Sequence, residues 1–417
     1  MRRALAALIL GLTLIAPASP QGAERALVLF NRINSMLREL EGIMGLRAIQ
    51  PIQREVLTRD EINKLVTDRI AEETTAEEIR QEELFLRMFG FAGEDFDLAE
   101  QVVDVMTEQA AALYDYKTKT LYLSDWADED MQEFALVHEL AHALADQHFD
   151  LGKFVDKADS SDEDLARSAV IEGQASWVMT EWLFNQTGRS LVGNRSIAEA
   201  SAASSRVEAK DYPVYSTSPL YLQRTLLFPY TDGLLFQQSL VDKYGKSAFR
   251  EMFVRPPNST RQILDPEAYF RGDKPDKPKL PRLRLKGWSR SSEGDIGELD
   301  HQILLEQHLG EKIASKTAPA WRGGRYELWE DADKQHVALR YGSLWAGADD
   351  ARRFFDSYRK ICEKKDPQFQ VLAKSRNRIL ARDSRGGLLI LLDGPTVQSL
   401  EGLPGDDAAL KAVYTDN

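Results

Sequence analysis

The chain has 417 residues, of which 43% are hydrophobic and 29% charged, and its formal net charge is −13. This composition excludes a disordered chain, and the length suits two folded units. Because binding to nucleic-acid phosphates needs a basic surface, the acidic balance argues against a nucleic-acid partner. A single cysteine, Cys362, excludes a disulfide within the chain.

The N-terminus has the composition of a secretory signal peptide. Arg2 and Arg3 precede an apolar run over residues 4–16, and Ala16-Pro17-Ala18 offers a cleavage site. The run is shorter than the ~20 residues of a transmembrane helix. We therefore assign residues 1–22 to a signal peptide and expect a secreted or periplasmic protein. Retention of this segment as an anchor stays open, and only then is stable membrane insertion expected.

Residues 24–112 alternate apolar and charged positions at helical spacing, which predicts three or four amphipathic helices. The segment REVL looks like a short strand, and Thr58 with Glu61 three residues later predicts a capped helix start. In ALYDYKTKTLYLSDW, residues 112–126, tyrosine and leucine alternate with polar residues, which predicts a β-hairpin or an edge strand.

The next predicted helix carries the sequence VHELAHALADQHFD, residues 137–150. His138 and His142 are four residues apart, so they project from one helix face within a turn of each other. Two such imidazoles can bind one zinc ion, and Glu139 can then act on the water that the ion binds. The HExxH spacing therefore predicts a catalytic Zn²⁺ site, which requires a third protein ligand and one open position.

Two residues compete for the place of the third ligand. His148 lies six residues after His142, but a sharp turn at Ala145 would be needed to bring it to the metal, and that position favours glycine. If the helix continues, His148 points away and serves in helix capping or packing. Glu172, in VIEGQASW on a second predicted helix that starts near Ser161 and Asp164, is the stronger candidate. Its small neighbours would let this helix approach the first.

The remaining chain divides into three parts. Residues 189–220 look like a long surface excursion, and FPYTDG, residues 228–233, looks like a turn ahead of a helix. Residues 271–299 form a Pro/Lys-rich segment whose proline spacing is typical of a solvated linker. Residues 300–417 alternate helical and strand patterns, which predicts a small α+β domain.

HELAH followed by EGQA resembles the gluzincin zinc metallopeptidases, a group that includes the thermolysin-like enzymes. HELAHALADQHFDL, IEGQA and FPYTDG together resemble a group of secreted, uncharacterised prokaryotic HExxH proteins. The resemblance implies that His138, His142 and Glu172 bind zinc and that Glu139 is the catalytic base. Ser176 stands where thermolysin-like enzymes carry an aspartate that orients a histidine, so the supporting residues are not assigned; Ser176 and Asp146 are candidates.

The combined prediction is an α+β protein with a mainly helical, zincin-like catalytic domain over residues 23–270. We expect it to hydrolyse a peptide or protein substrate, which binds along LYLSDW as along an edge strand. Tyr230 in FPYTDG is a candidate donor to the tetrahedral oxyanion, and an aromatic anchor in a turn is the competing interpretation. The alternative function is a secreted binding or scaffold protein with a structural or vestigial zinc site.

Overall fold

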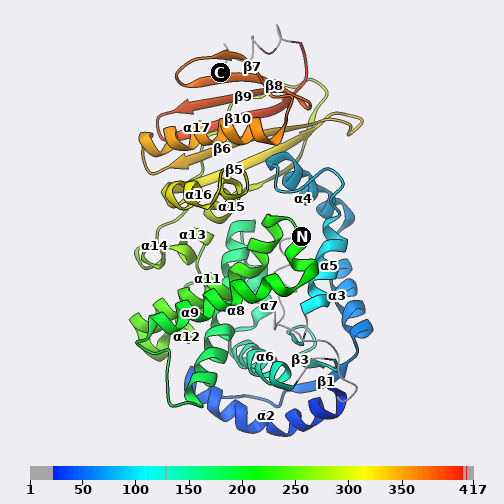
Figure 1. Cartoon of the computed structure of the whole chain (residues 1–417), viewed down its shortest axis with the longest axis vertical. Coiled ribbons are helices and arrows are strands. Elements are labelled where there is room, and N and C mark those ends of the chain that lie inside the picture. Colours follow the sequence, from blue (N-terminus) through cyan, green and yellow to red (C-terminus); the bar gives the residue numbers. More distant parts are fainter. Residues whose placement is uncertain (1–21, 110, 127–128, 407–409, 411–417) are drawn as a thin grey trace.

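The computed structural model describes residues 22–109, 111–126, 129–406 and 410. A mainly helical N-terminal region lies beneath a large antiparallel sheet formed by the C-terminal region (Figure 1). The predicted α+β class is confirmed. The expected signal peptide lies outside the described residues except for Gly22, which begins the first described helix. None of the described helices combines the length and the apolar character needed to span a bilayer.

The N-terminal region has four described helices over residues 22–109, where three or four were expected, and it continues into the HExxH helix. Its helices are α2 (Gly22–Met44), α3 (Arg59–Glu73), α4 (Ala76–Phe89), α5 (Leu98–Gln109), α6 (Glu129–Phe149), α7 (Leu151–Asp156), α8 (Ser161–Asn185), α9 (Arg195–Glu208), α10 (Pro213–Thr217), α11 (Leu220–Tyr244), α12 (Ala248–Val254), α13 (Thr260–Leu264) and α14 (Pro266–Arg271). Its strands are β1 (Gln53–Leu57), β2 (Ala112–Asp115) and β3 (Thr120–Ser124).

Helix starts follow the capping chemistry of the sequence. The Thr58 side chain accepts from the Glu61 N–H, and the Glu61 side chain accepts from the Thr58 N–H, as predicted. At α8 the N-cap is Ser160, one residue before the expected Ser161, and its side chain accepts from the Glu163 N–H. Within the predicted surface excursion, the chain forms helices α9 and α10.

The three N-terminal strands form a small mixed sheet in the order β1-β3-β2. β3 contains most of LYLSDW and pairs in parallel with β1 and antiparallel with β2. The β-hairpin predicted over residues 112–126 is confirmed by β2 and β3, whereas the expectation that LYLSDW is an edge strand is wrong, because β3 has a neighbour on both sides. The edge next to α6 belongs to β2, whose Tyr114 N–H donates to a side chain of α6.

Residues 228–233 also differ from the prediction. FPYTDG lies inside α11, with Pro229 in the helix interior. Proline has no N–H to donate to the carbonyl four residues earlier, so its presence normally marks a helix boundary. Here Phe228, Pro229 and Tyr230 are all buried, and the packing of the helix outweighs the lost hydrogen bond.

The C-terminal region is a seven-stranded sheet with helices on one side. Its strands are β4 (Ser289–Asp295), β5 (Trp321–Glu330), β6 (Val337–Trp345), β7 (Gln370–Lys374), β8 (Arg378–Asp383), β9 (Gly386–Asp393) and β10 (Thr396–Leu403), and its helices are α15 (Glu298–Leu309), α16 (Glu311–Thr317) and α17 (Ala348–Lys365). The strand order is β4-β5-β6-β10-β9-β8-β7, and every pair is antiparallel.

The segment 271–299 is not a free spacer in this fold. Its last part forms β4, which pairs with β5, and then enters α15. Its middle part runs across the sheet, where the Asp276 N–H donates to the Arg322 carbonyl at 2.8 Å. The predicted linker is therefore part of the C-terminal sheet structure.

Helix α4 joins the two regions. Arg80 makes two 2.8 Å hydrogen bonds to the buried carboxylate of Glu330 on β5. At the other end of α4, the Lys365 ammonium donates to the Met88 carbonyl at 2.7 Å. Phe85 packs against Tyr326 with ring centroids 4.8 Å apart. These contacts are polar at both ends of the helix and aromatic between them, so α4 is docked on β5 near its N-terminal end and at Phe85, and on helix α17 (Ala348–Lys365) at its C-terminal end (Figure 1).

Candidate metal centre

Helix α6 brings His138 and His142 together. The helix continues through Ala143, Leu144 and Ala145, which are all buried, and ends at Phe149. Two histidines four residues apart therefore stay on one face, and their Nε2 atoms lie 3.0 Å from each other.

Helix α8 supplies the third group. Glu172 Oε2 lies 3.0 Å from His138 Nε2 and 3.2 Å from His142 Nε2. The adjacent Gly173 faces α11, since a Cβ atom there would come within 2.2 Å of the Gly233 backbone. The glycine expected to bring α8 close to α6 instead permits a close approach of α8 to α11.

The spacing of the three atoms fits a zinc ion. Ligand atoms on a tetrahedron with bonds of ~2.0–2.1 Å are about 3.3 Å apart, and the observed separations are 3.0 to 3.2 Å. Two imidazoles and one carboxylate are also a donor set that catalytic zinc sites use. His138, His142 and Glu172 therefore form a cluster that can hold a metal ion.

The protein environment favours the charged forms of both His142 and Glu172. Burial works to lower the pKa of His142, but the carboxylates of Glu172, Glu139 and Asp146 together more than offset it, so the pKa lies above its ordinary value. Burial works to raise the pKa of Glu172, but His142 and His138 bring it below its ordinary value. Glu172 is thus kept as the carboxylate that a metal ligand must be.

Glu139 lies beside the cluster with its two oxygens in different environments. Oε2 accepts a 2.7 Å hydrogen bond from the Tyr114 N–H on β2. Oε1 is buried and has no hydrogen-bond partner in the described part of the chain. Burial raises the pKa of Glu139 against the opposing influence of His142 and His138. A carboxylate with a raised pKa and a free oxygen is well suited to accept a proton.

Tyr114 fastens β2 to α6 at two points, which sequence patterns did not predict. Besides its N–H contact to Glu139, its hydroxyl donates to Asp146 Oδ2 at 2.8 Å. Lys119 also donates to Asp146, at 2.7 Å and 2.9 Å, and Asp146 Oδ1 accepts from the Leu151 N–H. Asp146, one of the two candidates for a supporting role, therefore anchors the strand that holds Glu139.

Tyr230 reaches the cluster from α11. Its ring stacks on the His138 ring with centroids 5.9 Å apart and is 7% exposed. The candidate oxyanion donor is therefore next to one of the three clustered residues, although it comes from a helix and not from a turn. Ser176, the other candidate for support, is buried on α8, where its carbonyl accepts from the Thr180 hydroxyl.

His148 does not join the cluster. Its Nε2 lies 2.8 Å from the Arg47 carbonyl, and the ring packs near Phe149. The neighbouring Gln147 binds the main chain of Ile49 and Gln50. The end of α6 is thus used to hold the segment after α2, which is the packing role predicted if the helix continues.

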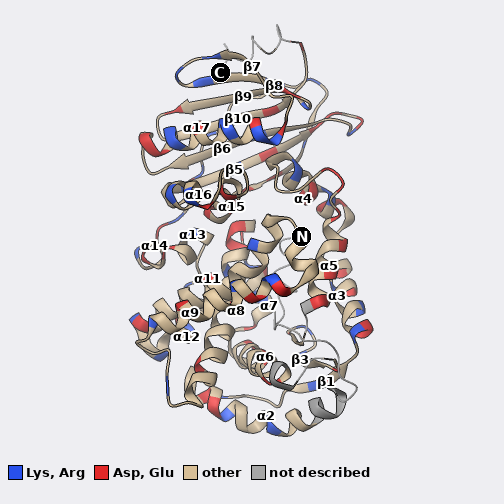
Figure 2. Cartoon of the chain, viewed as in Figure 1, with Lys and Arg blue, Asp and Glu red and all other residues tan. Residues whose placement is uncertain are grey.

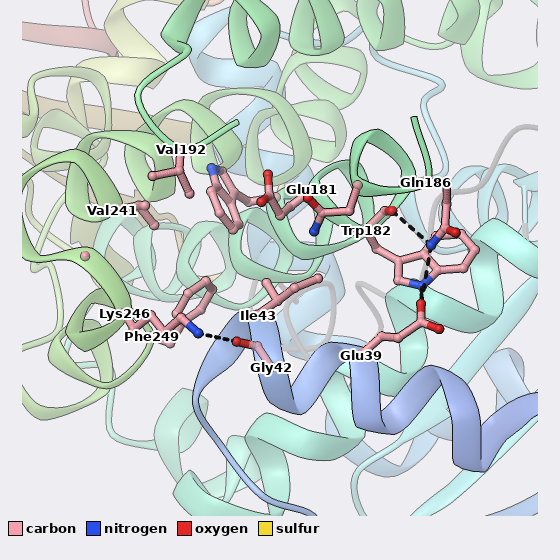
Figure 3. A pocket seen from close by; sticks show the side chains of 13 residues that line it. Glu39, Gly42, Ile43, Glu181, Trp182, Gln186, Val192, Val241, Lys246 and Phe249 are labelled. Carbon is pink, nitrogen blue, oxygen red and sulfur yellow. Dashed lines mark hydrogen bonds between the residues drawn. The ribbon is translucent and has the colours of Figure 1, made fainter. Parts of the chain in front are cut away.

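A cavity of about 590 Å³ lies elsewhere on α8, between this helix and α2, α11 and α12 (Figure 3). Apolar side chains such as Trp177 and Phe249 line it, and Glu39 at its rim accepts from the Trp182 indole N–H at 2.6 Å. Neither Glu139 nor any of the three clustered ligands lines this cavity. The cavity is therefore separate from the candidate metal centre.

Comparison with known families matches two segments of the chain. Residues 98–180 match the IrrE N-terminal-like domain of the Peptidase M78 family, and residues 282–413 match a domain of unknown function (DUF8575). The searches of curated proteins and of solved structures gave no match. The first match covers Tyr114, Glu139 and the three clustered residues and supports a metallopeptidase-like domain. Assignment to the gluzincin group stays a prediction.

Proposed function

We propose that the chain is a zinc-dependent peptidase with His138, His142 and Glu172 as metal ligands and Glu139 as general base. The observation that carries the proposal is the unpartnered oxygen of Glu139 beside a three-ligand cluster. Within that cluster the described residues supply three protein ligands, and catalytic zinc sites bind three and keep a fourth position for water.

The residues of the chain divide the work of hydrolysis. Zinc, when bound, lowers the pKa of a water molecule toward ~7 and polarises the scissile carbonyl. Glu139 accepts the proton of the attacking water and passes it to the leaving amine. The Tyr114 N–H holds the second oxygen of Glu139 during this transfer, and the Tyr230 hydroxyl donates to the oxyanion that develops.

The substrate in this proposal is a peptide or protein segment in extended conformation. β2 is the strand on the Glu139 side of the small sheet, and its Tyr114 N–H points away from β3 toward Glu139. Because this N–H is already bonded to Glu139 and every residue of β2 is buried, we do not assign the bound peptide to this strand edge. Secretion through a cleaved signal peptide remains part of the proposal and rests on residues 1–22 alone.

A second function is favoured by the burial of the site. Glu139, Glu172, His138 and His142 are each 4% exposed or less. A metal ion in so enclosed a position stabilises the fold, and the protein would then act as a scaffold. Such a site needs no general base, whereas the peptidase requires Glu139.

Replacement of Glu139 separates the two functions. Glu139→Gln should keep zinc and lose peptidase activity by about 10²- to 10⁴-fold, because general-base catalysis contributes that much. The measurement is cleavage of a peptide library together with the zinc content of each protein. Glu133→Gln, on the same helix but paired with Arg32, is the matched control and should cleave normally. Equal cleavage by the Glu139 variant would exclude the mechanism, and a zinc-loaded wild type that cleaves nothing would favour the scaffold.

A further inference from the structure

The segment between α14 and β4 concentrates positive charge in an acidic protein. From Lys277, just after Asp276, to Ser292 in β4, the chain has six lysines and arginines and no acidic residue, whereas the whole chain has 53 basic and 66 acidic residues. The six are Lys277, Lys279, Arg282, Arg284, Lys286 and Arg290, and each is exposed. We call residues 277–286 the basic strap (Lys and Arg are blue in Figure 2).

The main chain of the basic strap is fixed to the sheet. The Lys279 carbonyl accepts from the Gln398 side chain at 2.7 Å, and the Pro281 carbonyl accepts from Arg340 Nε at 2.6 Å. Gly342 on β6 leaves room for this crossing, since a Cβ atom there would lie 2.8 Å from the Lys279 carbonyl oxygen. The strap is therefore held by its backbone, and its charged side chains are not needed to hold it.

The side chains of the basic strap alternate between the sheet and the outside. Leu283 and Leu285 pack against the apolar cluster that includes Leu380, Leu389 and Leu400 on the strands below. Arg282, Arg284 and Lys286 are exposed between and after them. In an extended chain, residues two apart are separated by about 6.6 Å. The result is a row of cations above the face of a broad sheet.

Most of these cations have no partner within the protein. In the part of the chain that the structure describes, the side chains of Lys277, Lys279, Arg284 and Lys286 make no ion pair or hydrogen bond. Elsewhere in the molecule, exposed cations commonly pair with acids, as Arg290 does with Glu293. Lys277 lines a cavity together with Glu293 and Asp295, so the charges that stay available to an external anion are those of Lys279, Arg284 and Lys286.

We propose that the basic strap is a docking surface for an anionic phospholipid bilayer. Each cation close to such a surface strengthens binding by about fivefold, without requiring a pocket or a fixed register. The strap lies across a sheet face, and Leu283 and Leu285 turn inward, so its outward side is charged. Residues 277–286 contain no aromatic side chain, and Trp288, just after them, is only partly exposed. Binding of single-stranded nucleic acid relies on exposed aromatic rings for stacking, which favours the bilayer as partner. This inference does not depend on the metal centre.

Co-sedimentation of the full chain with vesicles tests the proposal. The protein should bind phosphatidylcholine vesicles that contain phosphatidylglycerol, should not bind phosphatidylcholine alone, and should be released by high salt. A variant with Lys279→Gln, Arg284→Gln and Lys286→Gln should bind about 100-fold more weakly. The matched control replaces three exposed, unpaired cations of the N-terminal region with glutamine, at Lys157, Arg189 and Lys210. This control has the same net charge as the strap variant, but it should bind anionic vesicles like the wild type.

Three results would overturn the proposal. The first is no sedimentation with anionic vesicles at low salt. The second is an equal loss in both triple variants, which would make net charge and not the strap responsible. The third is tighter binding to single-stranded DNA or to polyglutamate than to anionic vesicles, which would assign the strap to a different polyanion.

Discussion

The two regions of the molecule bury histidine in opposite electrostatic settings. His142 on α6 lies against the carboxylate of Glu172, and its pKa is raised. His301 on α15 lies between the Gly297 carbonyl at 2.7 Å and the Tyr341 hydroxyl at 2.6 Å, and burial lowers its pKa to about 4. A histidine beside a carboxylate can exchange its proton for a metal ion, whereas one satisfied by neutral groups serves packing. Burial alone therefore does not identify a functional histidine.

In each region a tyrosine also contacts a buried histidine, Tyr230 against His138 and Tyr341 against His301, and this gives the largest test of the comparison. Tyr230→Phe should lower kcat by about 10²- to 10³-fold with zinc retained, because one oxyanion donor is lost. Tyr341→Phe leaves His301 without its hydrogen-bond donor and should cost about 1–3 kcal/mol of stability without affecting kcat. Steady-state kinetics and urea unfolding of both variants measure the two effects. An equal loss of kcat in both would remove the distinction between the regions.

The opposite pKa shift of His301 predicts how stability depends on pH. Its folded pKa of about 4 lies below the ordinary 6.5, so the unfolded state takes up the proton first as pH falls. The contribution of neutral His301 to the free energy of unfolding is therefore fully present above pH 6.5. It decreases as the pH falls toward 4, by about 3 kcal/mol in total at 1.4 kcal/mol per pH unit.

Urea unfolding at several pH values measures this effect. The free energy of unfolding of His301→Gln should lack the decrease between pH 6.5 and 4 that the wild type shows. A variant at the exposed His336, His336→Gln, should keep the pH profile of the wild type. A parallel decline in all three proteins would show that His301 is not the titrating group.

A smaller effect is expected from the contact between β2 and Glu139. Tyr114→Pro removes the N–H that donates to Glu139. Because that N–H points away from β3, the pairing of β2 with β3 is kept. Tyr114→Ala removes the side chain equally but retains the N–H. The proline variant should therefore be about tenfold slower than the alanine variant at equal zinc content, since a hydrogen bond to a charged group is lost. Equal kcat values would mean that this N–H does not position the base.

The sequence predicted those parts of the site that follow from helix geometry. His138 and His142 follow from a spacing of four residues, and the choice of Glu172 over His148 follows from the uninterrupted helix through Ala145. Tyr114 could not be predicted, because its contact to Glu139 uses a main-chain N–H that every residue except proline offers.

Other errors arose where packing overrides local preference. Pro229 suggested a turn but lies in the interior of α11, where tertiary contacts hold the helix. The pattern of LYLSDW predicted a strand correctly, but no local pattern shows that β1, more than 60 residues earlier, pairs with its other side. The prolines of residues 271–299 suggested a free linker, although glycines on distant strands allow that chain to lie on the sheet.

The central claim is a metal centre of three protein ligands that includes Glu172 and not His148. Elemental mass spectrometry of the purified wild type, Glu172→Ala and His148→Ala tests it directly. We predict one zinc per chain in the wild type and in His148→Ala, and loss of the zinc in Glu172→Ala, because each ligand of a three-ligand site is required. Absence of zinc from the wild type after reloading, or its loss from His148→Ala with retention in Glu172→Ala, would contradict the account.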